Sequence, residues 1–423
     1  MLSDYSSRII IPTALREVDV TEFRDLVEHP IFNNLEQKTQ LSFVEKHRRG
    51  GRQSRYEHSI FVYHFTKELC KILVEMGFLT EEEARHVRGA SVVHDLGHPP
   101  FSHAIDNLLS SLYSLYTGSP KNHHARTKEL INNLSDIIKS IGLDTEEIIR
   151  IAAKEDEKSK IISHNTLGTD KLGYLLLDSH HTGYRFWAPF ILDMFPHYYY
   201  SADSLGIQEE KRYEVEDIQT FIQKMYMAVY LHPTVLRYSR FIQKAVESAV
   251  RSEELNLDDI WDMPEGALIY RLSHSNNPQV KKQMERYETS RDQKPDATLK
   301  IRGDDRHILL PKEILDSVSR ELEIPLKITE LEKDLSNEFG LEEDSVYITI
   351  PACLDRVIPE NVDLYDGRTK RGTLFERYPT HFKNLLERAE DFFALRIYSD
   401  SDEKFPGPDK VNEFFLCYFG MDK

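Results

Sequence analysis

Residues 94–103 read His-Asp-Leu-Gly-His-Pro-Pro-Phe-Ser-His and constrain this chain more than any other segment. Before them, Thr80 and Glu83 have the spacing of a capping box, and apolar residues up to Val93 recur at helical intervals. The sequence therefore predicts a core-facing helix that places His94 and Asp95 at its C-terminal end, with Gly97 terminating it. So many titratable groups beside apolar residues favour a divalent metal ion with acid–base partners.

The composition excludes several classes of protein. The chain has 423 residues, of which 54 are Lys or Arg and 71 are Asp or Glu, so its net charge is −17. This charge argues against nucleic acid or an anionic membrane as the main partner, although a local cluster of cations can still bind a small anion. No apolar stretch approaches the roughly 18 residues of a membrane span, and the N-terminus lacks the pattern of a secretory signal. The three cysteines, Cys70, Cys353 and Cys417, have no metal-binding spacing. We therefore expect a cytoplasmic protein with no membrane partner.

The pattern along the chain predicts a mainly α protein. Helices are expected at 57–76, 167–180 and 221–252, and another is opened by Asp144. The composition changes near residue 290, and strands are expected at 345–350, 362–374 and 394–398. We therefore expect a helical domain over 1–290 and a smaller α+β region over 291–423.

A second group of polar residues follows one face of the predicted helix 167–180. Asp170, Tyr174 and Asp178 recur at intervals of four residues, so they share that face. The stripe is either a solvated surface or the wall of a pocket. Upstream, Arg55 and His58 lie at the start of the long helix predicted at 57–76.

The order of these segments resembles the HD-domain metal-dependent phosphohydrolases. Arg55-Tyr56-Glu57-His58-Ser59 comes first, the segment 94–103 follows, and then come another His and the helical Asp170. Among these enzymes, the sequence is most similar to the deoxynucleoside triphosphate triphosphohydrolases. The likeness extends to 26–35, to 229–234 and to the predicted C-terminal strands. It implies an HD-domain helical core over 1–290 with a smaller α+β C-terminal region over 291–423.

The resemblance assigns a divalent metal ion to His58, His94, Asp95 and Asp170. Two imidazoles and two carboxylates suit Mn, Fe, Mg, Zn or Ni, and the sequence does not choose among these metals.

The resemblance also implies four catalytic residues: His98, His103, Asp106 and His123. Asp106 lies three residues after His103, so we expect its carboxylate to keep that imidazole protonated for transfer to the leaving 5′ oxygen. The family's separate catalytic His usually precedes an acidic residue, whereas this chain has His123-His124. The spacing to Thr127 favours His123, and His124 stays open as the alternative.

The substrate-binding residues implied by the resemblance are Arg55, Lys171, Tyr174 and Asp178. Arg and Lys suit phosphate groups, while Tyr and Asp can hydrogen-bond a sugar hydroxyl. The implied activity is metal-dependent hydrolysis of deoxynucleoside triphosphates to deoxynucleoside and triphosphate. Two alternatives stay open: an HD-type phosphodiesterase or nucleotidase on another nucleotide, or a nucleotide-sensing scaffold with an inactive site. The resemblance further implies a homo-oligomer with a nucleotide substrate, leaves an allosteric nucleotide open, and gives no reason to expect nucleic acid.

Overall fold

The computed structural model describes residues 9–184, 190–201, 204–290, 293–304, 307–342, 344–351, 357–401 and 403–419. Cys353 lies outside these ranges, whereas Cys70 is buried and Cys417 is exposed. No helix within the described ranges is both long enough and apolar enough to span a membrane.

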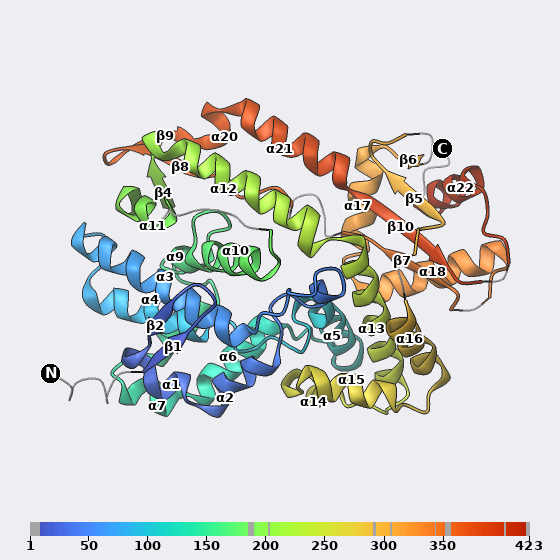
Figure 1. Cartoon of the computed structure of the whole chain (residues 1–423), viewed down its shortest axis with the longest axis horizontal. Coiled ribbons are helices and arrows are strands. Elements are labelled where there is room, and N and C mark those ends of the chain that lie inside the picture. Colours follow the sequence, from blue (N-terminus) through green and yellow to red (C-terminus); the bar gives the residue numbers. More distant parts are fainter. Residues whose placement is uncertain are drawn as a thin grey trace.

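The N-terminal half is built mainly of helices (Figure 1). They are α1 (Arg24–Val27), α2 (Pro30–Asn33), α3 (Arg55–Glu75), α4 (Glu81–Val93), α5 (His103–Thr117), α6 (His123–Asn133), α7 (Ser135–Ser140), α8 (Thr145–Ala152), α9 (Ser159–Ser163), α10 (Thr169–His181) and α11 (Phe190–Met194). The next group consists of α12 (Arg212–Met225), a π-helix (Tyr226–Tyr230), α13 (Pro233–Arg251), α14 (Leu257–Asp262), α15 (Glu265–Ser273) and α16 (Pro278–Thr289).

The C-terminal part mixes helices and strands, as the sequence predicts. The helices among its described residues are α17 (Lys312–Glu321), α18 (Pro325–Phe339), α20 (Leu374–Arg377), α21 (Pro379–Phe392) and α22 (Pro408–Tyr418). Figure 1 shows α12 and α21 running along one edge of the molecule, from a small sheet at one end to another sheet at the other end.

The described residues form three sheets. Strands β1 (Ile10–Pro12) and β2 (Glu17–Asp19) make an antiparallel pair. The second sheet has the order β6 (Ile308–Leu309), β5 (Ala297–Lys300), β10 (Ala394–Ser399), β7 (Val346–Thr349), and the third has the order β3 (Tyr198–Ser201), β4 (Ser204–Gln208), β8 (Asp363–Asp366), β9 (Thr369–Thr373).

In the third sheet, β4 pairs in parallel with β8, where Gly206 faces Asp363. Strands from both sides of the expected boundary after residue 290 therefore meet in one sheet. The boundary itself stays a prediction.

Side-chain caps explain where the helices that carry the candidate active site begin. Ser54 accepts a hydrogen bond from the Glu57 amide at the start of α3, and Asn122 accepts one from Ala125 at the start of α6. The predicted capping box of Thr80 and Glu83 is present at α4. Such caps satisfy amides that have no partner inside the helix.

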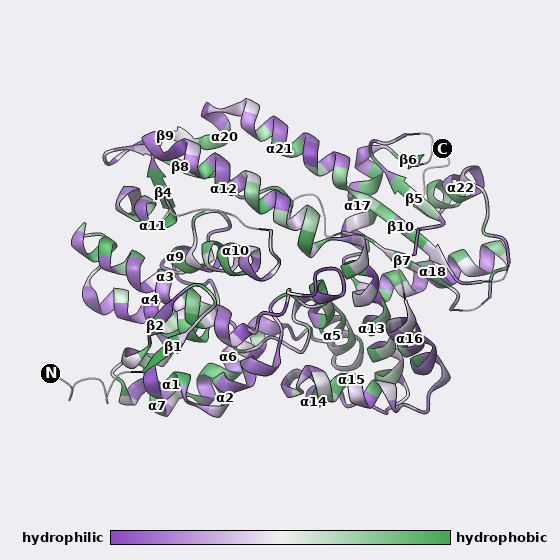
Figure 2. Cartoon of the chain, in the orientation of Figure 1, coloured by the Kyte–Doolittle hydropathy of each residue, from purple (hydrophilic) through white to green (hydrophobic). Residues whose placement is uncertain are grey.

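The core joins most of these elements. α3 packs against α4 and α10, and their buried faces contribute Ile60, Val87 and Leu172 to one large apolar cluster. A second cluster lies around β5, β7, β10 and α18, with Leu299, Ile348 and Leu331 among its members. In Figure 2 the helices carry hydrophilic and hydrophobic residues side by side, as expected for amphipathic helices with one buried face.

The structure refines two sequence expectations. The helix expected over 221–252 is interrupted by the π-helix and begins again at Pro233, which occupies the first position of α13. The strands β3 and β4 were not predicted because they are short, and because β4 is completed by β8, a strand far along the chain. By contrast, the strand–turn–strand pattern expected over 362–374 is present as β8 and β9.

Candidate active site

The first turn of α3 supplies two side chains of the site. His58 is completely buried, and Arg55, at the first helical position, is 1% exposed. Ser54 caps the beginning of α3, and packing against α4 and α10 holds this helix in the core. Arg55 and His58 therefore enter the site from a rigid element.

The end of α4 supplies the next two side chains. His94 caps the helix, and its Nδ1 atom lies 2.8 Å from the carbonyl oxygen of Ser91. If Nδ1 donates to that carbonyl, Nε2 keeps its lone pair for a cation, as is common for metal-binding histidines. Asp95 follows directly. The fourth residue, Asp170, lies in the first turn of α10.

These four side chains converge on one point. Nε2 of His58 lies 3.2 Å from an oxygen of Asp95 and 3.1 Å from an oxygen of Asp170. Nε2 of His94 lies 3.5 Å from Asp95 and 3.7 Å from Asp170. Yet neither Nε2 atom forms a hydrogen bond within the described part of the chain, although both are buried. Ligand atoms that lie close together without bonding one another are the arrangement that a shared cation requires, so the residues present fit a divalent metal ion.

The electrostatics of this group are consistent with that fit. Burial alone would lower the pKa of His58, but Asp170 and Asp95 raise it to about 9. Burial alone would raise the pKa of Asp95, but His94 and Arg55 keep it well below its usual range. Without a metal, the carboxylates therefore favour a proton on the imidazole, and a divalent cation has to displace that proton.

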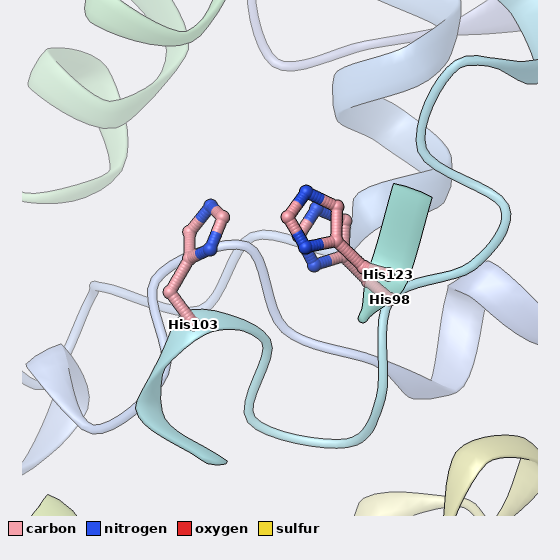
Figure 3. A group of neighbouring side chains, drawn as sticks. All are labelled: His98, His103 and His123. Carbon is pink, nitrogen blue, oxygen red and sulfur yellow. The ribbon is translucent and has the colours of Figure 1, made fainter. Parts of the chain in front are cut away.

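Three more histidines form a second group beside the first (Figure 3). The rings of His98 and His123 are stacked, with centroids 4.2 Å apart, and His103 stands edge-on at 4.7 Å from His98. His98 also lies 3.4 Å from an oxygen of Asp95, so the two groups are continuous. Burial, Arg55 and His123 lower the pKa of His98 well below its usual value, which makes this ring neutral at neutral pH.

The structure corrects the predicted partner of Asp106. One of its carboxylate oxygens lies 2.5 Å from Nδ1 of His123, and the other accepts a hydrogen bond of 3.0 Å from the His123 amide. The carboxylate therefore orients His123, whereas the sequence predicted that it would hold His103. His103 is the exposed member of this group.

Helix α6 reaches this position because it docks on the HD segment at Gly97. The Gly97 amide donates to the hydroxyl of Thr127 at 3.0 Å. A Cβ at Gly97 would lie only 2.2 Å from the carbonyl oxygen of His123, so a larger residue does not fit there. Gly97 thus permits a close approach and does not end α4, which finishes at Val93. This docking places His123 in the cluster, with His124 at its side.

Arg55 links the predicted metal-binding residues to the histidine segment. Its Nε donates to the hydroxyl of Ser102 at 2.6 Å, and its Nη1 donates to Asp95. Its Nη2 is buried and has no hydrogen-bond partner among the described residues. Burying a cationic hydrogen-bond donor without an acceptor costs free energy, and a bound anion that accepts the hydrogen bond removes this cost.

The predicted polar stripe of α10 lines the other end of the site. Lys171 donates to the hydroxyl of Tyr174, and both lie near the π-helix residue Tyr226. Asp178 is 1% exposed and accepts a hydrogen bond of 2.6 Å from Tyr230, whereas its Oδ1 has no partner in the described ranges. Burial raises the pKa of Asp178 to about 7, although the Tyr230 hydroxyl acts in the opposite direction.

The structure thus brings all twelve predicted site residues into one continuous region. Tyr230 lies in the segment 229–234 that resembles the family, but sequence reasoning missed its contact with Asp178, because nothing in its spacing links the two residues. The π-helix that carries it was also not predicted, although such segments are frequent at functional sites.

Comparison with known proteins identifies the class. Residues 55–179 match the sequence model of the HD domain, so this segment of the chain is an HD domain. It is 28% identical over 228 residues to an uncharacterized protein of Methanocaldococcus jannaschii, covering 53% of this chain and 46% of that one. It is 31% identical over 203 residues to the deoxynucleoside triphosphate triphosphohydrolase SAMHD1 homolog of Dictyostelium discoideum, covering 43% and 38% of the two chains. The chain thus spans less than half the length of these two relatives.

Solved structures share the overall architecture. A phosphohydrolase from Bacteroides thetaiotaomicron matches with a TM-score of 0.68 and 18% identity, over 93% of this chain and 99% of that one. A hypothetical protein from Aquifex aeolicus matches with a TM-score of 0.65 and 19% identity, over 97% and 99% of the two chains. At these identities the likeness establishes the fold alone.

Proposed function

We propose that this protein hydrolyses deoxynucleoside triphosphates to deoxynucleoside and triphosphate with a bound divalent metal ion. The observation that carries the proposal is a pair of buried groups without partners among the described residues, Nη2 of Arg55 and Oδ1 of Asp178. A cationic donor beside the metal ligands suits a phosphate oxygen, and a carboxyl acceptor beside Tyr230 suits a sugar hydroxyl. A nucleotide satisfies both groups at once.

The proposed reaction adds water to the α-phosphorus and breaks its bond to the 5′ oxygen, which leaves with a proton. When bound, a divalent cation supplies positive charge to the phosphate oxygens and lowers the pKa of water. Arg55 and Lys171 neutralise the phosphates. Asp106 contacts Nδ1 of His123, and this contact orients the ring so that its other nitrogen can face the substrate.

His103 remains the proposed acid for the 5′ oxygen. His103 is the exposed member of the cluster, so a ligand can reach it. Desolvation within the cluster, Arg55 and His123 lower the pKa of His103 to about 3. The negative charge of a triphosphate acts in the opposite direction, so His103 can serve as the acid only with substrate bound.

Two relatives support the choice of substrate by their names. One is the Dictyostelium protein described above, and the other is a deoxyguanosinetriphosphate triphosphohydrolase-like protein of a Jannaschia species, 34% identical over 112 residues. This second match covers 26% of each chain. The identity of the substrate is therefore part of the proposal, and the product analysis below tests it.

The test is a product analysis. The purified full chain is incubated with Mn, Fe, Mg, Zn or Ni and with a panel of deoxynucleoside, dideoxynucleoside and ribonucleoside triphosphates, cyclic nucleotides, monophosphates and single-stranded DNA. Each is assayed alone and with a second nucleotide, because the resemblance leaves an activator open. We expect deoxynucleoside and intact triphosphate, and weaker turnover of the dideoxy compounds, which offer Asp178 no 3′-hydroxyl.

A matched pair of variants controls the assay. Asp95→Ala removes a predicted metal ligand, whereas Asp136→Ala removes an exposed carboxylate on α7. Release of pyrophosphate, diphosphate or phosphate, or turnover of cyclic nucleotides alone, would show a different phosphohydrolase. Nucleotide binding without any product would favour the sensing scaffold.

A further inference from the structure

The turn between α4 and α5 has an unusual backbone. Phe101 and Ser102 have φ angles of 58° and 52°, in the left-handed region that residues with a side chain seldom adopt. This turn separates His98 from His103. Such a conformation persists only where the surroundings fix it.

Glu265, the first residue of α15, fixes one side of this turn. Its Oε1 accepts three hydrogen bonds: from the amide of Phe101 at 2.8 Å, from the amide of Thr39 at 2.7 Å and from the hydroxyl of Thr39 at 2.9 Å. One carboxylate oxygen therefore joins the strained turn to the segment that precedes α3.

Lys38 fixes the other side. Its ammonium group donates to the carbonyl oxygen of His98 at 2.7 Å and to that of Trp261 at 2.9 Å. Lys38 is 2% exposed, and it makes no ion pair within the described part of the chain, so these two carbonyls are the main partners of a buried cation. Both Trp261 and Glu265 belong to the short stretch α14–α15.

The contacts continue from the turn to the metal-binding residues. The hydroxyl of Ser102 donates to the carbonyl oxygen of Thr39 at 2.6 Å and accepts from Nε of Arg55. Arg55 in turn bonds Asp95. A displacement of the turn would therefore move both His98 and the partner of a metal ligand.

We propose that Glu265 and Lys38 are positioning residues for the catalytic turn. The match to the HD domain ends at residue 179, and α14–α15 lie beyond it. In this proposal, elements outside the HD match therefore help to shape the HD site. The two residues act through His98, His103 and Arg55, without contacting substrate. The activity readout of this inference rests on the proposed function, whereas its backbone readout does not.

The test compares Glu265→Ala with Glu265→Gln. The amide oxygen of Gln can accept the same three hydrogen bonds, so this variant should stay within about threefold of the wild type. Glu265→Ala should lower kcat by about 10²-fold, with KM and bound metal nearly unchanged, because displacement of a catalytic group by about 1 Å costs that much. Asp259→Ala, which removes an exposed carboxylate on α14, is the matched control.

Hydrogen exchange gives the second readout. The Phe101 amide should exchange faster in Glu265→Ala and remain protected in Glu265→Gln. Should Glu265→Ala not fold, Glu265→Asp carries the same test, since it keeps the charge but withdraws the acceptor by one methylene. Lys38→Met should likewise lower kcat more than it changes KM.

Three results would overturn the inference: unchanged kcat and exchange in Glu265→Ala, equal losses in the Ala and Gln variants, or a loss confined to KM. If the wild type turns over no nucleotide, the proposed function fails, and hydrogen exchange still decides whether Glu265 holds the turn.

Discussion

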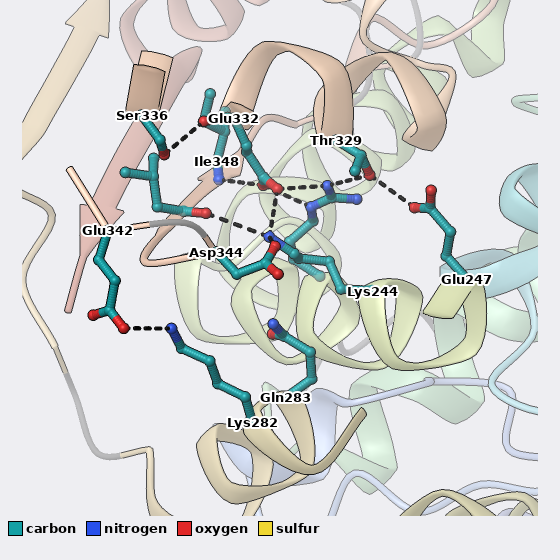
Figure 4. Close-up of polar contacts among 12 residues, drawn as sticks. Lys244, Glu247, Lys282, Gln283, Thr329, Glu332, Ser336, Glu342, Asp344 and Ile348 are labelled. Atoms are coloured by element: carbon teal, nitrogen blue, oxygen red, sulfur yellow. Dashed lines mark hydrogen bonds and ion pairs between the residues drawn. The ribbon is translucent and has the colours of Figure 1, made fainter. Parts of the chain in front are cut away.

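Glu332 of α18 provides a quantitative test of how the C-terminal region is attached to the helical core. Its carboxylate accepts two hydrogen bonds of 2.8 Å from Arg240 and one of 2.9 Å from Lys244, both on α13, and one of 2.8 Å from the Ile348 amide in β7 (Figure 4). The group is buried, with Glu332 3% exposed. Buried charges of this kind are stable only when they are fully paired.

The magnitude follows from the pKa of Glu332. Burial raises it, but Arg240 and Lys244 lower it to about 2 from its ordinary 4.5. At about 1.4 kcal/mol per pKa unit, this shift corresponds to about 3 kcal/mol of folding free energy. Because the folded state has the lower pKa, the stabilisation is present above pH 4.5 and is lost as the pH falls toward 2.

Glu332→Gln should therefore lower the free energy of unfolding by about 3 kcal/mol at pH 7, measured by urea denaturation. The difference from the wild type should shrink as the pH falls below about 4.5, because the wild-type carboxylate is then protonated as well. Glu330→Gln is the control, since Glu330 is an exposed residue of the same helix that pairs with Lys327. It should change stability by less than about 0.5 kcal/mol. A Glu332→Gln effect as small as that of the control, or one that does not depend on pH, would refute the reasoning.

Four further predictions concern the active site. Asp95→Ala should lose bound metal and turnover while the helical circular dichroism is kept; full metal occupancy by elemental analysis would contradict the ligand assignment. His103→Ala should lower kcat by about 10²–10⁴-fold with metal still bound, and by less for a substrate with a p-nitrophenolate leaving group, which needs no acid. His123→Ala should be impaired to a similar degree and His124→Ala only mildly, and the reverse ranking of kcat would contradict the register of α6. Asp106→Asn should lower kcat by disturbing His123, so adding it to His123→Ala should cost little more; full additivity would argue for another partner.

That the candidate metal-binding residues lie together could be predicted, because each lies on a helix whose start or end can be recognised in the local sequence. Ser54 and the capping box of Thr80 and Glu83 set the helices that carry His58 and His94. Their order along the chain then matched a known family. The strands at 346–349 and 394–399 were predictable for a similar reason, since runs of β-branched and aromatic residues favour strands.

The partner of Asp106 could not be predicted from spacing. Three residues separate Asp106 from His103, a distance at which side chains on a helix often meet. The loop after Thr117, however, returns the chain so that both the amide and the ring of His123 face the carboxylate. That contact depends on the docking of α6 at Gly97, and local periodicity carries no information about docking.

The same limit applies to every residue that shapes the site from beyond residue 179. Tyr230 fixes one oxygen of Asp178, and Glu265 holds the amide of Phe101, yet neither has a motif of its own. Their contribution is to hold an acceptor or a donor in place, and many residue types at many positions can do this. Metal ligation and proton transfer, by contrast, admit few residue types. A chain can therefore reveal which chemistry it performs through a short motif, while the geometry that makes the motif effective is distributed over segments that only the folded structure brings together.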